Sequence, residues 1–276
     1  MLNIFGYYRA HFSHKIQSTV YQKLILILTL LLLVSCAGSE TKDSLASEQG
    51  DAKELYEKGE KQLQNKNYTL AIEKFETLES RYPFGPYAQQ AQLDIAYAYF
   101  ELQEPDSAIA AADQFIKLNP RHKHVDYAYY VKGLANFSRF DGALDRFIPK
   151  DLGDLDTNPI KQAFNDFKRL VTRFPDSPYA ADAEQRMIYL RNLLANHEYK
   201  VAEFYQRRGA PVAVINRSTH LIKTYDGSDV IPDTLVLMAN AYKKLGLQDS
   251  LEDTLKVISL NFPGRAPQLT EEIESR

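Results

Sequence analysis

The sequence predicts an all-α protein, a superhelical solenoid of about five helix pairs. The first observation is an internal repeat, because small residues and prolines return at a near-constant interval along most of the chain. The second is the stretch between Pro178 and Gly209, which contains no other Gly or Pro and therefore predicts one long helix. A repeat of this length indicates stacked units, each of which buries its apolar face on its neighbours.

The first unit lies in the stretch "YEKGEKQLQNKNYTLAIEKFETLESRYP". Its marker residues follow one another at spacings of 12, 4 and 8, and they are Gly59, Ala71, Phe75 and Pro83. This is the tetratricopeptide pattern, in which two antiparallel helices cross at small residues and a proline ends the second helix. Small residues let the two backbones approach, and proline cannot continue a helix.

Four further units follow in near register. Their corresponding residues are Ala96, Ala108 and Pro120 in the second, Gly133, Ala163, Phe167 and Pro175 in the third, Ala202, Val214 and Asp226 in the fourth, and Ala239, Leu251 and Pro263 in the fifth. The interval from Gly133 to Ala163 is 30 residues where the first unit has 12, which predicts an insertion of 18 residues. We therefore expect a repeat domain at 52–264, with an N-terminal half at 52–140, the insertion at 141–158, a C-terminal half at 159–264 and a tail at 265–276.

The N-terminus carries an apolar run from Leu24 to Val34, about eleven residues long. A membrane span needs roughly 20 apolar residues, so this run fits the core of a secretory signal peptide better. The residues from Leu33 to Cys36 resemble the lipobox of bacterial lipoproteins, which implies cleavage before Cys36 and attachment of a diacylglyceryl group to its sulfur. We expect a lipoprotein signal peptide at 1–35 and a lipidated N-terminus with a flexible, polar tether at 36–51.

Two alternatives stay open for this region. Cys36 is the only cysteine in the sequence, so it could instead be a free thiol after an ordinary signal peptide. The first nineteen residues are long for the start of a signal peptide, and Val20 could be the true start of the protein. If Cys36 is lipidated, Ala37 after it favours the outer membrane over retention in the inner membrane, with the folded part facing the periplasm.

Composition and motifs argue against most catalytic classes. The formal net charge is −3 with acids and bases interspersed, which argues against a nucleic-acid-binding protein. His197 and Glu198 begin a zinc-protease-like motif, but Val201 stands where the second histidine belongs. The aspartates of the insertion do not have the spacing of an EF-hand calcium loop. We therefore expect that the protein is not an enzyme and has no catalytic residue, metal or cofactor. The rival class is a solenoid enzyme, such as a periplasmic transglycosylase, but such an enzyme would carry a separate catalytic domain.

The first helix of each pair lines the concave face in this repeat class. Aromatic and leucine side chains dominate the positions on that face in the first three units. The predicted peptide-binding groove consists of Tyr56, Leu93, Tyr97, Phe100, Tyr127, Tyr130, Leu134 and Phe137. Large exposed apolar patches usually mark interaction sites, and aromatic residues are strong interface residues. The alternative is that these side chains pack on one another, or that the N-terminal segment fills the groove.

The most specific stretch of the chain runs from Ala163 to Arg217 and contains "FPDSPY", "RMIYLRNLLANHE" and "RGAPVAVINR". With a lipobox cysteine, five tetratricopeptide units and no other domain, the chain resembles the BamD (ComL) family of outer-membrane assembly lipoproteins over essentially its whole mature length. It departs from the family pattern at Phe204, where a tyrosine is usual, and at Pro211, where an aromatic residue is usual.

The resemblance implies a non-catalytic subunit of the β-barrel assembly machinery. It would bind the barrel subunit BamA through its C-terminal repeats. Its N-terminal repeats would receive the C-terminal signal of unfolded outer-membrane proteins, a strand-forming segment that ends in an aromatic residue. Other assembly lipoproteins are further expected partners.

Two arginines carry the implied partner role. Arg208 and Arg217 match positions of the family motif that, by the resemblance, couple partner binding to substrate binding. Their alternative role is a structural ion pair with Glu198 or Glu203. The alternative function for the whole chain is another lipid-anchored tetratricopeptide scaffold, such as a pilus-assembly pilotin or a cell-envelope adaptor.

Overall fold

The computed structural model describes residues 42–140 and 156–275. The chain divides into two compact units, residues 1–51 and 52–276, and the predicted repeats lie in the second. Cys36, the predicted signal peptide and most of the predicted insertion lie outside the described residues. The helices are α2 (Lys42–Gln64), α3 (Tyr68–Arg81), α4 (Pro86–Glu101), α5 (Pro105–Leu118), α6 (Val125–Phe140), α7 (Asn158–Arg173), α8 (Ala180–Arg207), α9 (Pro211–Thr224), α10 (Ile231–Leu245), α11 (Gln248–Asn261) and α12 (Ala266–Ser275).

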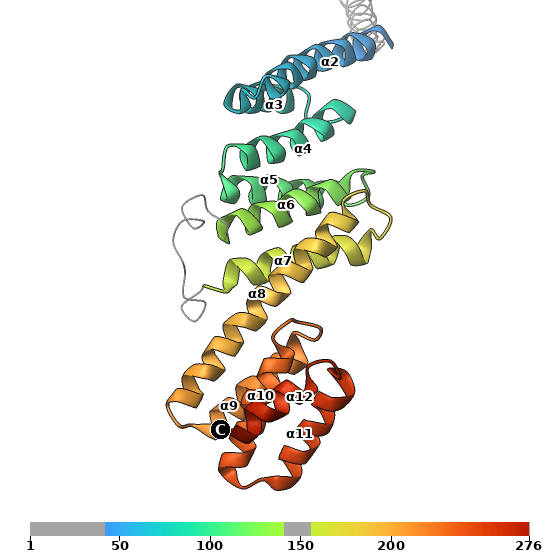
Figure 1. Cartoon of the computed structure of the whole chain (residues 1–276). Coiled ribbons are helices and arrows are strands. Elements are labelled where there is room, and N and C mark those ends of the chain that lie inside the picture. Colours follow the sequence, from blue (N-terminus) through green and yellow to red (C-terminus); the bar gives the residue numbers. More distant parts are fainter. Residues whose placement is uncertain (1–41, 141–155, 276) are drawn as a thin grey trace, which may run out of the picture. The chain divides into compact units, whose positions relative to one another are not determined.

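Within the second unit each helix from α3 to α11 packs on the next one in the chain (Figure 1). Ala52 and Tyr56 of α2 pack with Phe75 of α3. The helices therefore pair as α2/α3, α4/α5, α6/α7, α8/α9 and α10/α11, which confirms the predicted all-α repeat fold. Helices α4, α5, α7, α9 and α10 have proline in the first turn, where the missing N–H would have no helical partner. Among the described helices none is long and apolar enough to cross a membrane.

The two helices of a pair cross at the residues that the repeat pattern marks. A Cβ atom at Gly59 would lie 2.4 Å from Cε1 of Phe75, so only glycine fits against that ring. Ala96, Ala202 and Ala239, which hold the position of Gly59 in other units, are completely buried. The register assigned from the sequence is therefore confirmed in the first, second, fourth and fifth units.

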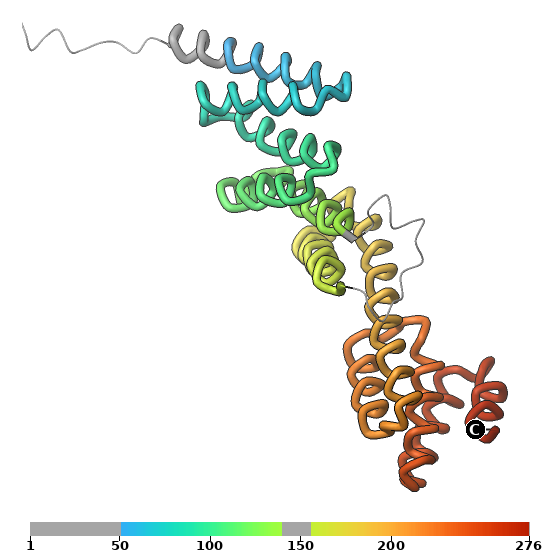
Figure 2. The backbone as a smooth tube through the Cα atoms, turned by 90° about the vertical axis from the view of Figure 1, so that its left-hand side faces the viewer, coloured from blue at the N-terminus to red at the C-terminus, as the bar shows by residue number. Residues whose placement is uncertain are grey.

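Helix α8 is the long helix that the sequence predicts, and it has 28 residues. It packs on α7, on α9 and on α10, so it links the third pair to the pairs that follow (Figure 2). Leu190, Leu194 and Ala202 are buried along it. The predicted insertion falls between Phe140, the last residue of α6, and Asn158, the first residue of α7.

The predicted C-terminal tail is wrong, because residues 266–275 form helix α12. Leu269 and Ile273 are only 1% and 2% exposed, and α12 packs on α10 and α11. Lys243 Nζ of α10 also donates to the carbonyl oxygen of Ile273, at 3.1 Å. A repeat array leaves an apolar face open at its end, and α12 covers that face.

The tether predicted at 36–51 is also shorter than expected, because α2 begins at Lys42. The stretch from 42 to 51 contains no proline and a single glycine, so nothing in it stops the helix of the first repeat from extending backwards. Polar composition suggested a flexible chain, although polar residues are also compatible with an exposed helix.

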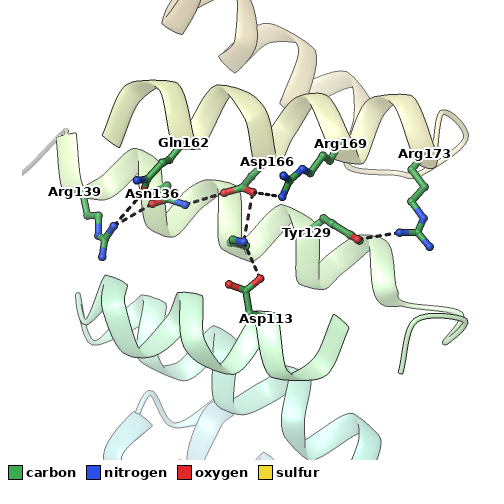
Figure 3. Close-up of polar contacts among 9 residues, drawn as sticks. Asp113, Tyr129, Asn136, Arg139, Gln162, Asp166, Arg169 and Arg173 are labelled. Carbon is green, nitrogen blue, oxygen red and sulfur yellow. Dashed lines mark hydrogen bonds and ion pairs between the residues drawn. The ribbon is translucent and has the colours of Figure 1, made fainter. Parts of the chain in front are cut away.

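A buried polar network joins α5, α6 and α7 (Figure 3). Asp166 of α7 is 4% exposed and accepts a hydrogen bond from Asn136 Nδ2 at 2.8 Å. Lys132 Nζ lies 2.7 Å from Asp113 of α5 and 3.6 Å from Asp166. Burial raises the pKa of Asp166, and Lys132 acts in the opposite direction. Because a buried charge without these partners would be costly, the network favours one register of α6 against both neighbours.

Candidate protein-binding site

Three tyrosines meet between α6 and the start of α8. Tyr127 and Tyr130 stand three residues apart on α6, on one side of the helix, and both face Tyr179, the residue before α8. The ring centroids of Tyr130 and Tyr179 are 4.8 Å apart and the rings are stacked, and those of Tyr127 and Tyr179 are 5.2 Å apart. All three side chains are partly buried. With Tyr97 of α4, these residues are called the aromatic surface below.

Tyr97 extends this surface towards α3. The Tyr97 ring makes an edge contact with Tyr68, with ring centroids 6.4 Å apart, and the Tyr68 hydroxyl donates to Glu101 at 3.1 Å. Tyr97 and Glu101 both lie within electrostatic range of the Tyr127 hydroxyl. Burial, with Glu101 next, raises the pKa of Tyr97 to about 12, so its hydroxyl remains a neutral hydrogen-bond donor at physiological pH.

Charged side chains of α8 fix the other end of the aromatic surface. The Tyr130 hydroxyl donates to Asp182 Oδ2 at 2.7 Å, and Arg186 Nε lies 2.5 Å from the same oxygen. The Arg186 guanidinium lies 5.3 Å from the centre of the Phe137 ring, and Phe137 contacts Tyr189 with ring centroids 6.0 Å apart. The rings are thereby held in place before any ligand binds.

A partly buried carboxyl group lies between the first two helix pairs. Asp94 of α4 accepts hydrogen bonds from the Tyr56 hydroxyl at 2.8 Å and from Gln90 Nε2 at 3.1 Å. Burial raises the pKa of Asp94 to about 6, and the negative charge of Glu60 adds to the shift. Tyr56 contacts Phe75 and Tyr87, so it belongs to the packing of the first two pairs.

The predicted groove residues therefore divide into two groups. Tyr97, Tyr127 and Tyr130 contribute to one continuous surface, whereas Leu93 is 1% exposed and lies in the core. Leu93 was expected to face a ligand, but the turn of α4 that carries it packs against other helices. The remaining predicted residues, Tyr56, Phe100, Leu134 and Phe137, are partly buried and pack on the core clusters.

Sequence reasoning missed four residues of this region, which are Tyr68, Tyr179, Asp182 and Tyr189. The counting of groove positions covered only the first helices of the first three units, and each of these residues lies elsewhere. Tyr179 stands inside the "FPDSPY" stretch, which was the one available signal.

The two predicted partner arginines differ in their surroundings. Arg217 Nη1 of α9 lies 3.1 Å from Oε2 of Glu198 in α8; the Arg217 side chain is 45% exposed and that of Glu198 is 11% exposed. Arg208 directly follows α8, is exposed, and places its guanidinium 5.2 Å from the centre of the Phe204 ring. The ion pair that sequence reasoning left open for Arg217 is thus present, and its exposed edge is also free to meet a partner.

A family model and the relatives similar in sequence point to one family. The family model described as "YfiO: Outer membrane lipoprotein" matches residues 48–257. A protein of Neisseria meningitidis serogroup A (strain Z2491), named outer membrane protein assembly factor BamD, is 38% identical over 252 residues, 90% of this chain and 94% of that protein. The chain belongs to the BamD family of outer-membrane lipoproteins. The protein of the same name from Vibrio cholerae O1 is 39% identical over 242 residues, 87% of this chain and 98% of that protein.

Membership of the BamD family confirms the family predicted from the sequence and its outer-membrane location. The family is one of assembly factors, in agreement with the expectation of a non-catalytic protein. Within the described residues, no three His, Cys, Asp or Glu side chains lie close enough to hold a metal ion. The two departures from the family pattern are local: Phe204 is 44% exposed, and Pro211 begins α9.

Proposed function

We propose that this chain is a lipid-anchored adaptor of the outer-membrane β-barrel assembly machinery. Its N-terminal repeats bind the C-terminal segment of an unfolded outer-membrane protein through the aromatic surface. Its C-terminal repeats hold the barrel subunit BamA, with Arg208 and Arg217 in the contact, and other assembly lipoproteins are further partners. The lipid on Cys36 keeps both activities at the periplasmic side of the outer membrane.

The observation that carries the proposal is the stacked arrangement of Tyr127, Tyr130 and Tyr179. An extended segment that ends in an aromatic ring can place that ring against these faces, and an aromatic pair adds about 0.5–1.5 kcal/mol beyond the burial of area. The surface is organised in advance, because Asp182 holds the Tyr130 hydroxyl and Arg186 holds Asp182. Side chains that are already fixed lose little conformational entropy when a ligand binds.

Exposed arginines of the C-terminal half support the proposed contact with BamA. Glu198 is mostly buried and holds one edge of the Arg217 guanidinium, while nearly half of the Arg217 side chain stays exposed. A guanidinium has five donors in a planar fork, so a carboxylate of a partner can bind the edge that Glu198 does not use. Arg208 is displayed in a comparable way on the ring of Phe204.

The test titrates a labelled peptide, the C-terminal segment of an outer-membrane barrel protein, against the purified lipoprotein. The double variant Tyr97→Ala/Tyr130→Ala removes two rings of the aromatic surface, so we expect it to bind the peptide about tenfold more weakly. BamA should still co-purify with it. Phe84→Ala is the matched control, because Phe84 is 90% exposed in the turn between α3 and α4, outside the aromatic surface.

Thermal unfolding of each variant separates lost binding from lost structure. A double variant that melts like the wild type and binds the peptide equally well would refute the peptide-binding role. If that variant instead releases BamA and keeps the peptide, the two halves of the repeat array have exchanged roles.

A further inference from the structure

The outer face of helix α7 carries basic and neutral side chains but no acidic one. Its apolar side chains Ile160, Ala163, Phe167 and Leu170 are buried, whereas Lys161, Lys168, Arg169 and Arg173 are exposed. The sole acidic residue of α7 is Asp166, which points inward and already has Lys132 and Asn136 as partners (Figure 3). A chain with a formal net charge of −3 therefore presents a helix face that carries four cations and no exposed acid.

Three of these cations border one depression. It has a volume of about 660 Å³ and is lined by Tyr129, Asn165, Lys168, Arg169, Thr172 and Arg173. Every side chain of the lining carries at least one hydrogen-bond donor, and none carries a negative charge. We call it the α7 pocket.

The arginines of the α7 pocket are positioned but not neutralised. Arg173 Nη1 donates to the Tyr129 hydroxyl at 3.0 Å (Figure 3). The Arg173 guanidinium also lies 5.5 Å from the centre of the Phe174 ring. Arg169 Nη1 lies 3.8 Å from Asp166, whose charge Lys132 already shares, and the Arg169 side chain is 65% exposed. Both arginine side chains are exposed, so donors of both guanidinium groups remain accessible to a ligand.

We propose that the α7 pocket binds the phosphate group of an anionic phospholipid headgroup. A phosphate presents several acceptor oxygens, and the planar fork of arginine matches phosphate geometry. A single carboxylate has two oxygens and one charge, so it would leave donors of Lys168, Arg169 or Arg173 without a partner. Anionic headgroups are within reach of a protein of an outer-membrane lipoprotein family, and basic residues close to an anionic membrane surface are attracted to it.

The experiment uses the intact lipidated protein in lipid nanodiscs of phosphatidylcholine, with or without phosphatidylglycerol. An amine-reactive reagent labels exposed lysines, and mass spectrometry gives the labelling rate of each one. We expect phosphatidylglycerol to slow the labelling of Lys168 about fivefold or more, because the bound headgroup covers its ammonium group. Lys161, on the same helix face but outside the pocket, and Lys223 of α9 serve as internal controls and should change less than about twofold.

The variant Arg169→Gln/Arg173→Gln should remove the protection of Lys168, and Lys161→Gln should keep it. Equal protection of Lys168 and Lys161 would show a diffuse electrostatic effect and would overturn the pocket. Where phosphatidylglycerol gives no protection, protection of Lys168 in discs of phosphatidylcholine alone by added inorganic phosphate would assign free phosphate, and protection by a glutamate-rich peptide would assign an acidic protein segment. Either result, or no protection at all, overturns the lipid assignment.

Discussion

A Cβ atom at Gly133 of α6 would lie 2.6 Å from Cε1 of Phe167 on α7, a separation that real Cβ atoms essentially never show. The same relationship holds between Gly59 and Phe75 in the first pair, at 2.4 Å. In both pairs the glycine leaves room for a buried phenylalanine ring on the neighbouring helix, where any larger residue would collide with the ring.

Gly133→Leu should therefore overpack the third pair. We expect a loss of about 1–3 kcal/mol in the free energy of unfolding, because the completely buried Phe167 ring cannot move aside. Denaturant titration measures the loss. Gly264→Ala is the control, since no atom lies within 4 Å of the position of its Cβ. An unchanged unfolding midpoint for Gly133→Leu would mean that the crossing of α6 and α7 is looser than the structure indicates.

The ion pair between Arg217 and Glu198 leads to the second prediction. Arg217→Ala leaves the mostly buried Glu198 carboxylate without its cation, which should cost about 1–3 kcal/mol of stability. Arg208→Ala should cost less, since Arg208 is exposed and stacks on Phe204. Thermal unfolding of both variants gives the comparison.

The same variants separate structure from partner binding. Glu198→Gln keeps Arg217 and an amide oxygen that can accept from it, so it should retain BamA in a pull-down from solubilised membranes. Arg217→Ala should lose BamA. If Glu198→Gln and Arg217→Ala release BamA to the same extent, Arg217 does not contact BamA directly. It then acts only by holding α8 against α9 through its ion pair with Glu198.

The fold could be predicted because its signal is repeated. Gly59 and Gly133 each stand opposite a phenylalanine, and a spacing that recurs at Ala96, Ala202 and Ala239 fixes the register of all five pairs. Helix α12 was missed because it belongs to no repeat. Its apolar residues Leu269 and Ile273 are too few to distinguish a terminal helix from a tail.

The site was predicted only in part, for a physical reason. Counting positions places Tyr97, Tyr127 and Tyr130 on the first helices of their pairs, and the structure brings them together. Tyr179 completes the surface, but it stands before α8, where no repeat position applies. Contacts between units, such as that of Tyr130 with Asp182, depend on how neighbouring pairs pack and leave no spacing in the sequence.

Helix α12 gives the third prediction. Leu269→Ala should destabilise the protein by about 2–5 kcal/mol, because it truncates a buried side chain of the helix that packs on α10 and α11. Gln268→Ala, on the exposed side of the same helix, should have little effect. Hydrogen exchange of α10 and α11 checks the mechanism, since their amides should exchange faster in Leu269→Ala. Equal exchange in both variants would mean that α12 does not cover the last pair in solution.

The fourth prediction concerns the pH dependence of stability at Asp94. Its pKa is raised from 3.8 to about 6, first by burial and then by the charge of Glu60. The groups that face it are Tyr56 and Glu60 from α2, Gln90 from its own helix and Tyr127 from α6. Between these two pH values the folded protein keeps a proton that the unfolded chain has lost. The contribution of Asp94 to stability is therefore full below pH 3.8 and is lost as the pH rises to about 6.

Asp94→Asn should remove this contribution to the pH dependence. The difference in melting temperature between the variant and the wild type should shift in favour of the variant between pH 4 and pH 7, because the asparagine has no charge to bury. Its amide oxygen can still accept from the Tyr56 hydroxyl, so the packing of α2 on α4 should persist.

Asp176→Asn, at an exposed position between α7 and α8, is the control and should show a constant difference. Burial also raises the pKa of Asp166, so the wild type keeps a slope of the same sign from that group, and only the difference between variants reports Asp94. A difference that stays constant across this pH range would show that Asp94 titrates at its ordinary pKa.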